Sequence, residues 1–154
     1  MSKKSGDNRT IFIYNFVFFL GLNVIVNAVC KYISAHNLLF QNPVIRLTFV
    51  HNTGAAFNLF ESQIPFLVAL GVLALIYIIH RVYISSNSLN KASAVGFSLM
   101  AAGIVHNMYE RVCLGYVQDY FDLNFIHFPV FNMADIIITC GAVILISQIL
   151  AKKL

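Results

Sequence analysis

The amino-acid sequence predicts an α-helical membrane protein with four transmembrane helices and a small sheet outside the membrane. Its 154 residues are 59% hydrophobic and only 10% charged, and the mean hydropathy is +0.78. A soluble domain of this length would be about 45–50% apolar and about 25% charged. The excess of apolar side chains therefore indicates lipid-facing surface, in a single membrane domain that covers residues 1–154.

Four apolar segments are long enough to cross a bilayer, which takes about 20 residues. They cover residues 11–33, 64–84, 92–113 and 130–150. The first follows basic residues, as in a secretory signal peptide, but it is too long for the apolar part of one and lacks a cleavage site of small residues. We therefore expect it to remain attached as a membrane span.

Basic residues gather on one side of this four-span arrangement. Seven of the ten flank the predicted inner ends of the spans: Lys3, Lys4, Arg9, Arg81, Lys91, Lys152 and Lys153. Because cytoplasmic segments are enriched in Lys and Arg, we expect both termini to be cytoplasmic. The net charge of +4 thus reflects membrane topology, and we expect no nucleic-acid partner.

The connections between spans are expected to differ on the two sides. A polar run at residues 85–90 is the predicted inner connection, and residues 34–63 and 114–129 are the outer ones. Residues 44–50 alternate in part and are rich in β-branched types, which favours a strand. Asn52, Thr53 and Gly54 follow and favour a turn. The expected result is a small sheet at the outer membrane surface.

Two aspartates occur where a membrane protein tolerates them least. Asp119 lies just after the third predicted span, and Asp135 lies in the first turns of the fourth. An ionised carboxylate in hydrocarbon is costly, so an acid kept at a span indicates a function. The short connection predicts that the two carboxyl groups meet and share a proton, which makes one an acid and the other a base. Asp122 is the competing candidate for this role.

Polar residues recur at helical spacing in the first and third spans and are expected to face a common interior. They are Asn23, Asn27 and Lys31 in the first span, and Gly103, Asn107 and Arg111 with neighbouring Glu110 in the third. Hydrogen bonding between helices and support of an active site are both open interpretations. A stripe of small residues, Ala94, Ser98 and Ala102, is expected to let another helix pack closely.

Other common chemistries have no support in the sequence. The five histidines are scattered without a metal-binding spacing, and the three cysteines are far apart. Patterns typical of serine hydrolases, P-loops and dinucleotide sites do not occur in the sequence. We therefore expect no metal and no cofactor.

Four motifs, taken in order, resemble those of lipoprotein signal peptidase, the signal peptidase II family. They are residues 52–57 (Asn-Thr-Gly-Ala-Ala-Phe), Asn107 with Arg111, residues 115–122 (Gly-Tyr-Val-Gln-Asp-Tyr-Phe-Asp), and residues 128–135, which hold Phe128-Pro129, Phe131-Asn132 and Ala134-Asp135. The order, the spacing and the number of spans match along nearly the whole chain.

The resemblance implies an aspartic endopeptidase of the bacterial inner membrane, which removes the signal peptide of prolipoproteins on the amino side of a diacylglyceryl-modified cysteine. By motif, Asp119 and Asp135 match the catalytic pair. Five polar or small residues match those that shape the site and bind the substrate backbone in the family: Asn52, Gly54, Asn107, Arg111 and Asn132. Lys31 and Glu110 are expected to give structural support. The resemblance also implies an extracytoplasmic β-cradle, an active site toward the outer leaflet, and a monomer surrounded by membrane lipids.

Three positions depart from the family pattern. Asn27 stands four residues before Lys31 where the family has an aspartate, and His106 and Glu110 replace a glycine and an aspartate. The first change removes a negative charge that would neutralise Lys31. An alternative function is therefore a paralogue with altered specificity, or one that binds lipidated chains without cleaving them. A small proton or ion conductor is a third hypothesis.

Overall fold

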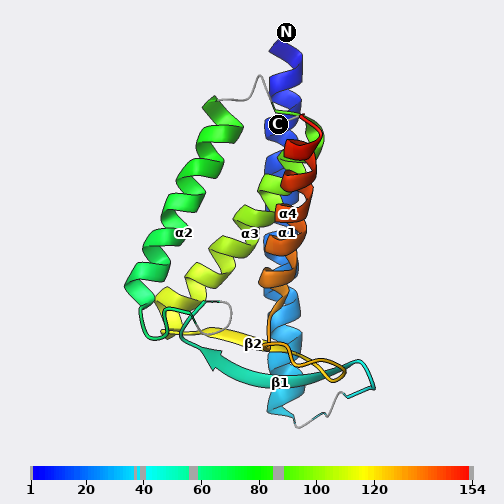
Figure 1. Ribbon diagram of the computed structural model, residues 1–154, viewed down its shortest axis with the longest axis vertical. Coiled ribbons are helices and arrows are strands. Elements are labelled where there is room, and N and C mark those ends of the chain that lie inside the picture. Colours follow the sequence, from blue (N-terminus) through cyan, green and yellow to red (C-terminus); the bar gives the residue numbers. More distant parts are fainter. Residues whose placement is uncertain (1, 37, 39–40, 56–58, 85–88, 153–154) are drawn as a thin grey trace.

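The computed structural model describes residues 2–36, 38, 41–55, 59–84 and 89–152, and helices dominate it (Figure 1). In chain order, the elements are α1 (Ser2–Ala35), β1 (Ile45–Asn52), α2 (Ile64–Ile79), the π-helical turn η2 (His80–Ile84), α3 (Lys91–Leu114), β2 (Val117–Leu123) and α4 (Met133–Leu150). Of the predicted inner connection at 85–90, residues 85–88 lie outside the described residues, as do Ala56 and Phe57 of the first motif.

Three helices of the described chain are long and apolar enough to cross a membrane. They are Asn8–Ala35, Ile64–Ile84 and Met133–Leu150, which correspond to the first, second and fourth predicted spans. α3, the third predicted span, is 24 residues long but is not among them, because polar residues such as Asn107 and Glu110 reduce its mean hydropathy. A fourth crossing by α3 therefore stays a prediction.

Capping residues set the ends of α3 and the start of α4. Asn90 Oδ1 accepts a hydrogen bond from the backbone N–H of Ser93 at 2.8 Å, which starts α3. At its other end Gly115 has a φ of 79°, a left-handed conformation that favours glycine and turns the chain into β2. α4 begins at Met133 rather than at the predicted residue 130, because Asn132 caps it.

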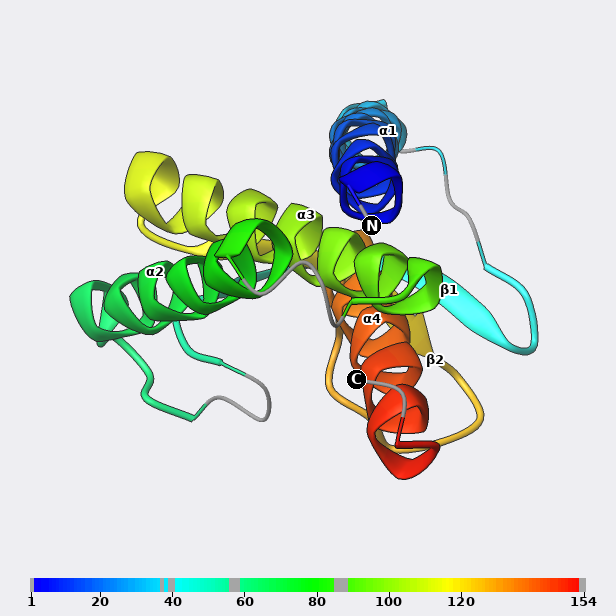
Figure 2. The same ribbon diagram turned by 90° about the horizontal axis from the view of Figure 1, so that it is seen from above.

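α3 is the central helix, and α1, α2 and α4 lie around it (Figure 2). The small residues Ala94, Ser98 and Ala102 are fully buried, so the predicted close helix packing is confirmed. Glycine completes the contact with α4. A Cβ atom built at Gly141 would lie 2.6 Å from the backbone oxygen of Gly96, which means that the two helices nearly touch backbone to backbone.

We expect Gly141→Ala to lower the stability of the protein in detergent by roughly 1–3 kcal/mol. The added methyl group would meet the Gly96 oxygen at 2.6 Å and Met100 Cγ at 2.7 Å, so the helices must separate. Thermal unfolding measures the effect. Gly21→Ala is the matched control, because nothing lies within 4 Å of a Cβ atom there. Equal melting temperatures for the two variants would contradict close packing at Gly141.

The sheet has two antiparallel strands, β1 and β2, at the end of the helices opposite the start of α1 and the end of α4 (Figure 1). The predicted strand at 44–50 is confirmed, but it runs on to Asn52, which pairs with Val117 instead of belonging to the turn. β2 was not predicted, and residues 114–129 were expected only as a connection. Pairing places Val50 opposite Asp119, so the sheet carries one of the two key aspartates.

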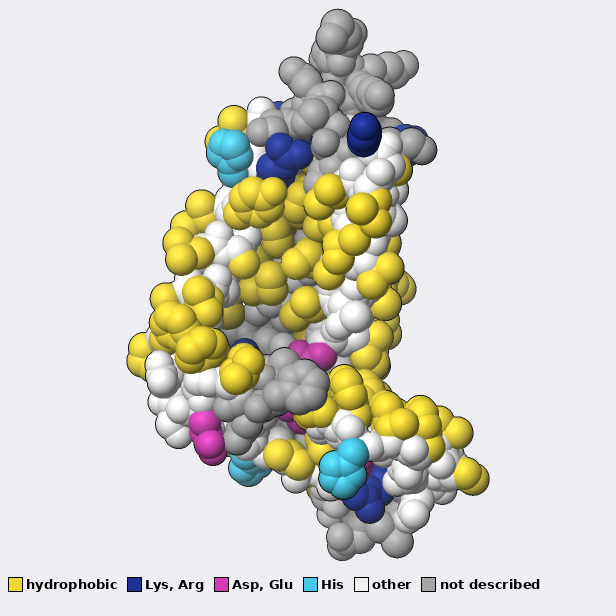
Figure 3. Space-filling view, viewed as in Figure 1, with side chains coloured by type: hydrophobic (Ala, Val, Ile, Leu, Met, Phe, Trp, Pro, Cys, Tyr) yellow, Lys and Arg dark blue, Asp and Glu magenta, His cyan; other side chains and the backbone are white. Residues whose placement is uncertain are grey.

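One face of the molecule shows how charge is distributed along the helices (Figure 3). Apolar side chains cover the middle of this face, where α3 lies between α2 and α4. Lys and Arg side chains gather at the end near the chain termini, and charged side chains of both signs appear toward the sheet. This separation is the pattern expected of a protein whose apolar middle lies in a bilayer.

Candidate active site

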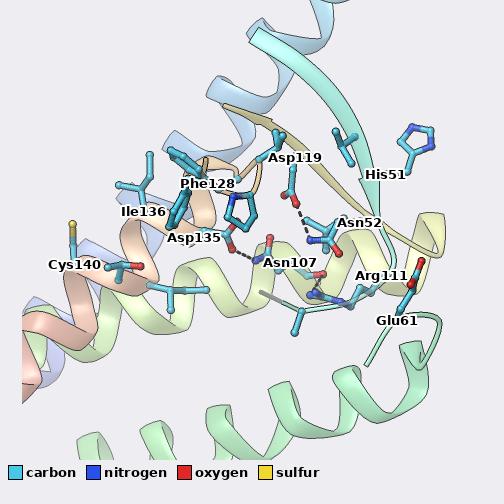
Figure 4. A pocket seen from close by; sticks show the side chains of 18 residues that line it. His51, Asn52, Glu61, Asn107, Arg111, Asp119, Phe128, Asp135, Ile136 and Cys140 are labelled. Atoms are coloured by element: carbon cyan, nitrogen blue, oxygen red, sulfur yellow. Dashed lines mark hydrogen bonds between the residues drawn. The ribbon is translucent and has the colours of Figure 1, made fainter. Parts of the chain in front are cut away.

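Asp119 and Asp135 open onto one cavity of about 960 Å³, between the sheet and the adjoining ends of α3 and α4 (Figure 4). β2 carries Asp119, and the first turn of α4 carries Asp135. The polar and ionisable residues among the other lining side chains are His51, Asn52, Glu61, Asn107, Arg111, Thr139 and Cys140. The structure thus brings together the two carboxyl groups that the sequence predicted to meet.

Asp119 is buried and held by two amide side chains. The residue is only 2% exposed, and its carboxylate accepts hydrogen bonds from Asn52 Nδ2 and Asn132 Nδ2, both at 2.8 Å. The pKa of Asp119 is raised to about 7, chiefly by burial and in smaller part by the nearby Asp135, although the hydrogen bonds from Asn52 and Asn132 and the charge of Arg111 oppose the shift. Asp119 can therefore hold a proton near neutral pH.

Asp135 is fixed at the start of α4 by a capping box with Asn132. The Asn132 side chain accepts from the Asp135 backbone N–H at 3.0 Å, and Asp135 Oδ2 accepts from the Asn132 backbone N–H at 3.1 Å. Asp135 Oδ1 accepts from Asn107 Nδ2 at 2.9 Å. Since Asn132 is bonded to both aspartates, its single side chain sets their relative position.

Arg111 and Gly54 hold the end of β1 against the site. Arg111 Nη2 donates to the Gly54 backbone oxygen at 2.7 Å, and its Nη1 donates to the Asn107 backbone oxygen at 3.3 Å. The Gly54 backbone N–H donates to Asn52 Oδ1 at 2.9 Å. The polar residues expected at the site, Asn52, Gly54, Asn107, Arg111 and Asn132, therefore form one connected network with the aspartates.

Glu110 lies behind this network and connects three elements. It is 2% exposed; its Oε1 accepts from Asn27 Nδ2 at 2.8 Å, and its Oε2 accepts from the Gln118 backbone N–H at 2.8 Å. Lys31 Nζ lies 3.6 Å from the same Oε1. Asn27 supplies no negative charge to Lys31, but Glu110 does, so the acid that the family pattern places at residue 27 has a substitute in α3. Two of the three departures from the family pattern, at 27 and 110, contact each other.

Several candidates lie apart from the cavity. Asp122, the competing candidate for the role of Asp119, forms an ion pair with Arg46, whose Nη2 lies 2.6 Å from Asp122 Oδ2. Asp122 does not line the cavity. Asn23 donates to the backbone oxygen of Phe19 within its own helix at 3.0 Å. His106 is buried in α3 and is not among the lining residues. In the described part of the chain, no three His, Cys, Asp or Glu side chains are grouped as metal ligands would be.

The sequence did not identify Glu61, His51 or the apolar wall as parts of the site. The wall comes from α4 and the segment before it, and includes Phe128, Ile136 and Cys140 (Figure 4). Glu61 and His51 are exposed residues in the outer segment without any regular spacing, so no pattern in the sequence distinguishes them.

The chain is similar to known proteins along most of its length. The sequence model of the family described as Signal peptidase (SPase) II matches residues 15–151. A lipoprotein signal peptidase of Latilactobacillus sakei is 38% identical over 110 residues, which are 71% of this chain and 72% of that protein. One of Microcystis aeruginosa is 32% identical over 141 residues, which are 86% of this chain and 89% of that protein.

Solved structures show the same fold. A bacterial membrane enzyme determined by the in meso method at 2.3 Å resolution superposes with a TM-score of 0.77 and is 27% identical, covering 91% of this chain and 87% of that one. A second, at 1.9 Å, gives a TM-score of 0.70 with 26% identity, covering 94% and 93%. Together with the apolar helices, these matches identify a multi-pass bacterial membrane protein. The chain therefore belongs to the signal peptidase II family and is a membrane peptidase of that family.

Proposed function

We propose that this peptidase removes the signal peptide of prolipoproteins on the amino side of a diacylglyceryl-modified cysteine, with Asp119 and Asp135 as its catalytic residues. One observation carries the proposal: both carboxyl groups line a single cavity and both accept hydrogen bonds from Asn132, Asp119 from its side-chain Nδ2 and Asp135 from its backbone N–H. Two carboxyl groups placed in this way can activate a water molecule and protonate a peptide without a covalent intermediate.

In the proposed reaction, Asp135 is the base and Asp119 carries the proton. The helix N-terminus and the Asn132 backbone N–H stabilise a negative charge on Asp135, whereas the pKa of Asp119, raised to about 7 chiefly by burial, leaves it protonated below that pH. Asp135 takes a proton from water, the water oxygen attacks the scissile carbonyl carbon, and Asp119 donates its proton to the carbonyl oxygen. As the C–N bond breaks, Asp135 gives the proton that it took from water to the leaving amine, and Asp119 takes a proton back from a hydroxyl of the tetrahedral intermediate. A carboxyl group then remains on the signal peptide, and both aspartates are back in their starting states.

The surrounding residues position the reacting groups. Asn52 and Asn132 orient Asp119, and Asn107 orients Asp135, so the two carboxyl groups meet the attacking water and the scissile carbonyl in one geometry. Asn107 and Arg111 also line the cavity, where they can bind the substrate backbone. Lys31 and Glu110 act as structural support from behind, because neither lines the cavity.

We propose an arrangement of the protein in the membrane as well. Chain 1–154 is one domain that crosses the bacterial inner membrane four times, α3 included, with both termini in the cytoplasm and the sheet as a β-cradle at the outer leaflet. The basic side chains at the end near the termini support this orientation. The lipid tails of the substrate stay in the bilayer against the apolar wall of the cavity, and the protein works as a monomer.

We expect kcat/KM to fall as the pH rises through about 7, the value to which burial raises the pKa of Asp119. Below that pH Asp119 is protonated and can donate, and above it the ionised carboxylate cannot. Initial rates on lipid-modified prolipoprotein between about pH 5 and 9 measure this limb. Melting temperatures over the same range serve as the control for unfolding. A rate that instead increases through pH 7 would make Asp119 the base.

A processing assay tests the proposed function itself. Purified protein is incubated with a prolipoprotein whose cysteine carries diacylglycerol, and the released signal peptide is identified by mass. We expect cleavage directly before the modified cysteine and little cleavage of the unmodified precursor. Protein that binds the lipidated precursor without releasing its signal peptide would refute the catalytic proposal in favour of a binding paralogue.

A further inference from the structure

The cavity has two unlike ends, with the aspartate pair between them (Figure 4). Phe128, Ile136 and Cys140 mark the apolar end, on α4 and the segment that precedes it. Glu61 and His51 mark the polar end, on the outer segment that contains β1. A substrate chain that crosses the site therefore contacts apolar side chains on one side of the two carboxyl groups and polar or charged side chains on the other.

Glu61 occupies a strained turn whose backbone is held by its neighbours. Phe60 and Ser62, on either side of it, have φ values of 57° and 62°, in the left-handed region that side chains disfavour. Such strain costs about 1–3 kcal/mol per residue and is typical of segments that hold ligands. The backbone N–H of Ser62 donates to the Thr53 oxygen at 3.2 Å, which ties the turn to the end of β1. The turn therefore keeps Glu61 at the cavity.

Glu61 also determines the charge that a substrate meets at the polar end. Among the described lining residues, three carboxyl groups (Glu61, Asp119 and Asp135) stand against one guanidinium, Arg111. Arg111 directs its Nη atoms to the backbone oxygens of Gly54 and Asn107, and Asp119 is buried. Glu61 is exposed, so its charge is available to an incoming side chain.

We infer that Glu61 selects substrates with a cationic side chain directly after the lipid-modified cysteine. The inference rests on the proposed function, since it concerns the same cleavage. The signal peptide and the lipid tails are apolar and match the wall formed by Phe128 and Ile136. The mature chain is the water-soluble part of the precursor, so its first residues leave through the polar end, past Glu61.

The test uses one lipid-modified prolipoprotein with Lys, Ser or Glu directly after the modified cysteine. For each enzyme the result is the ratio of kcat/KM for the Lys substrate to that for the Glu substrate, so differences in overall activity cancel. An exposed charge pair contributes little, and we expect the wild type to prefer Lys by about two- to fivefold. Glu61→Asp should keep the preference, Glu61→Gln should bring the ratio near one, and Glu61→Lys should reverse it.

The outcomes distinguish a failure of the inference about Glu61 from a failure of the proposed function. A wild type that cleaves the Ser substrate but gives a ratio near one overturns the inference and leaves the peptidase assignment intact. A wild type that cleaves none of the three overturns the proposed function. A preference for Lys that persists in Glu61→Gln assigns the selectivity to another group and also overturns the inference. The wild-type preference should decrease in about 1 M salt, because screening weakens exposed charge pairs.

Discussion

Asp119→Asn and Asp135→Asn are each expected to lower the rate of prolipoprotein cleavage by roughly 10²–10⁴-fold, the usual contribution of a general acid or base. An amide can neither take a proton from water nor give one to the carbonyl oxygen. Both replacements keep the shape of the side chain, and the network around Asn132 can still form most of its hydrogen bonds. Conversion of the lipid-modified precursor, followed on a gel, gives the initial rates.

Asp122→Asn is the matched control for these variants. It removes an acid from the same strand, three residues after Asp119, but from a side chain that pairs with Arg46 away from the cavity. We expect this variant to cleave at the wild-type rate. If Asp119→Asn or Asp135→Asn were as active as Asp122→Asn, the two-aspartate mechanism would be wrong. Melting temperatures of all three variants distinguish lost chemistry from lost folding.

That Asp119 and Asp135 lie at one cavity could be predicted from the sequence for a physical reason. Acids at membrane spans are costly, so Asp119 and Asp135 are conspicuous in an apolar chain, and the short connection between them limits how far apart they can lie. The first, second and fourth spans could be predicted from length and composition in the same way, although α4 begins three residues later than expected. The support residues Asn52, Asn107 and Arg111 were identified through the resemblance of their motifs, because spacing alone left structural and functional roles equally open.

The parts that the sequence did not predict depend on contacts between distant residues. β2 is short and carries two acids, which disfavour a strand, and it forms because β1 pairs with it. The bond between Asn27 and Glu110 joins residues 83 positions apart. Glu61 enters the cavity through a strained turn that no periodicity indicates. Propensity and spacing describe local structure, and these features are set by tertiary packing.

The second large effect concerns the hydrogen bonds of Glu110: Glu110→Ala is expected to reduce the free energy of unfolding by about 2–6 kcal/mol, the cost of leaving two buried donors unpaired. The change leaves Asn27 Nδ2 and the Gln118 backbone N–H without their acceptor, and each buried donor left unpaired costs about 1–3 kcal/mol. The lost ion pair contributes less, because the Lys31 side chain is 44% exposed. The melting temperature in detergent should fall on the order of 10 °C.

Two further variants separate the causes of this loss. Glu110→Gln keeps one acceptor oxygen and the volume of the side chain, so we expect it to lose less than half as much stability. Glu61→Ala removes the other glutamate of the chain, which is exposed, and should change stability by no more than about 0.5 kcal/mol. If Glu110→Ala melted like Glu61→Ala, the network would not hold α1, α3 and β2 together.

Because Gln118 directly precedes Asp119, we also expect Glu110→Ala to lower the cleavage rate at temperatures where the variant is still folded. The cause would be a displaced β2, since Glu110 takes no part in the chemical step.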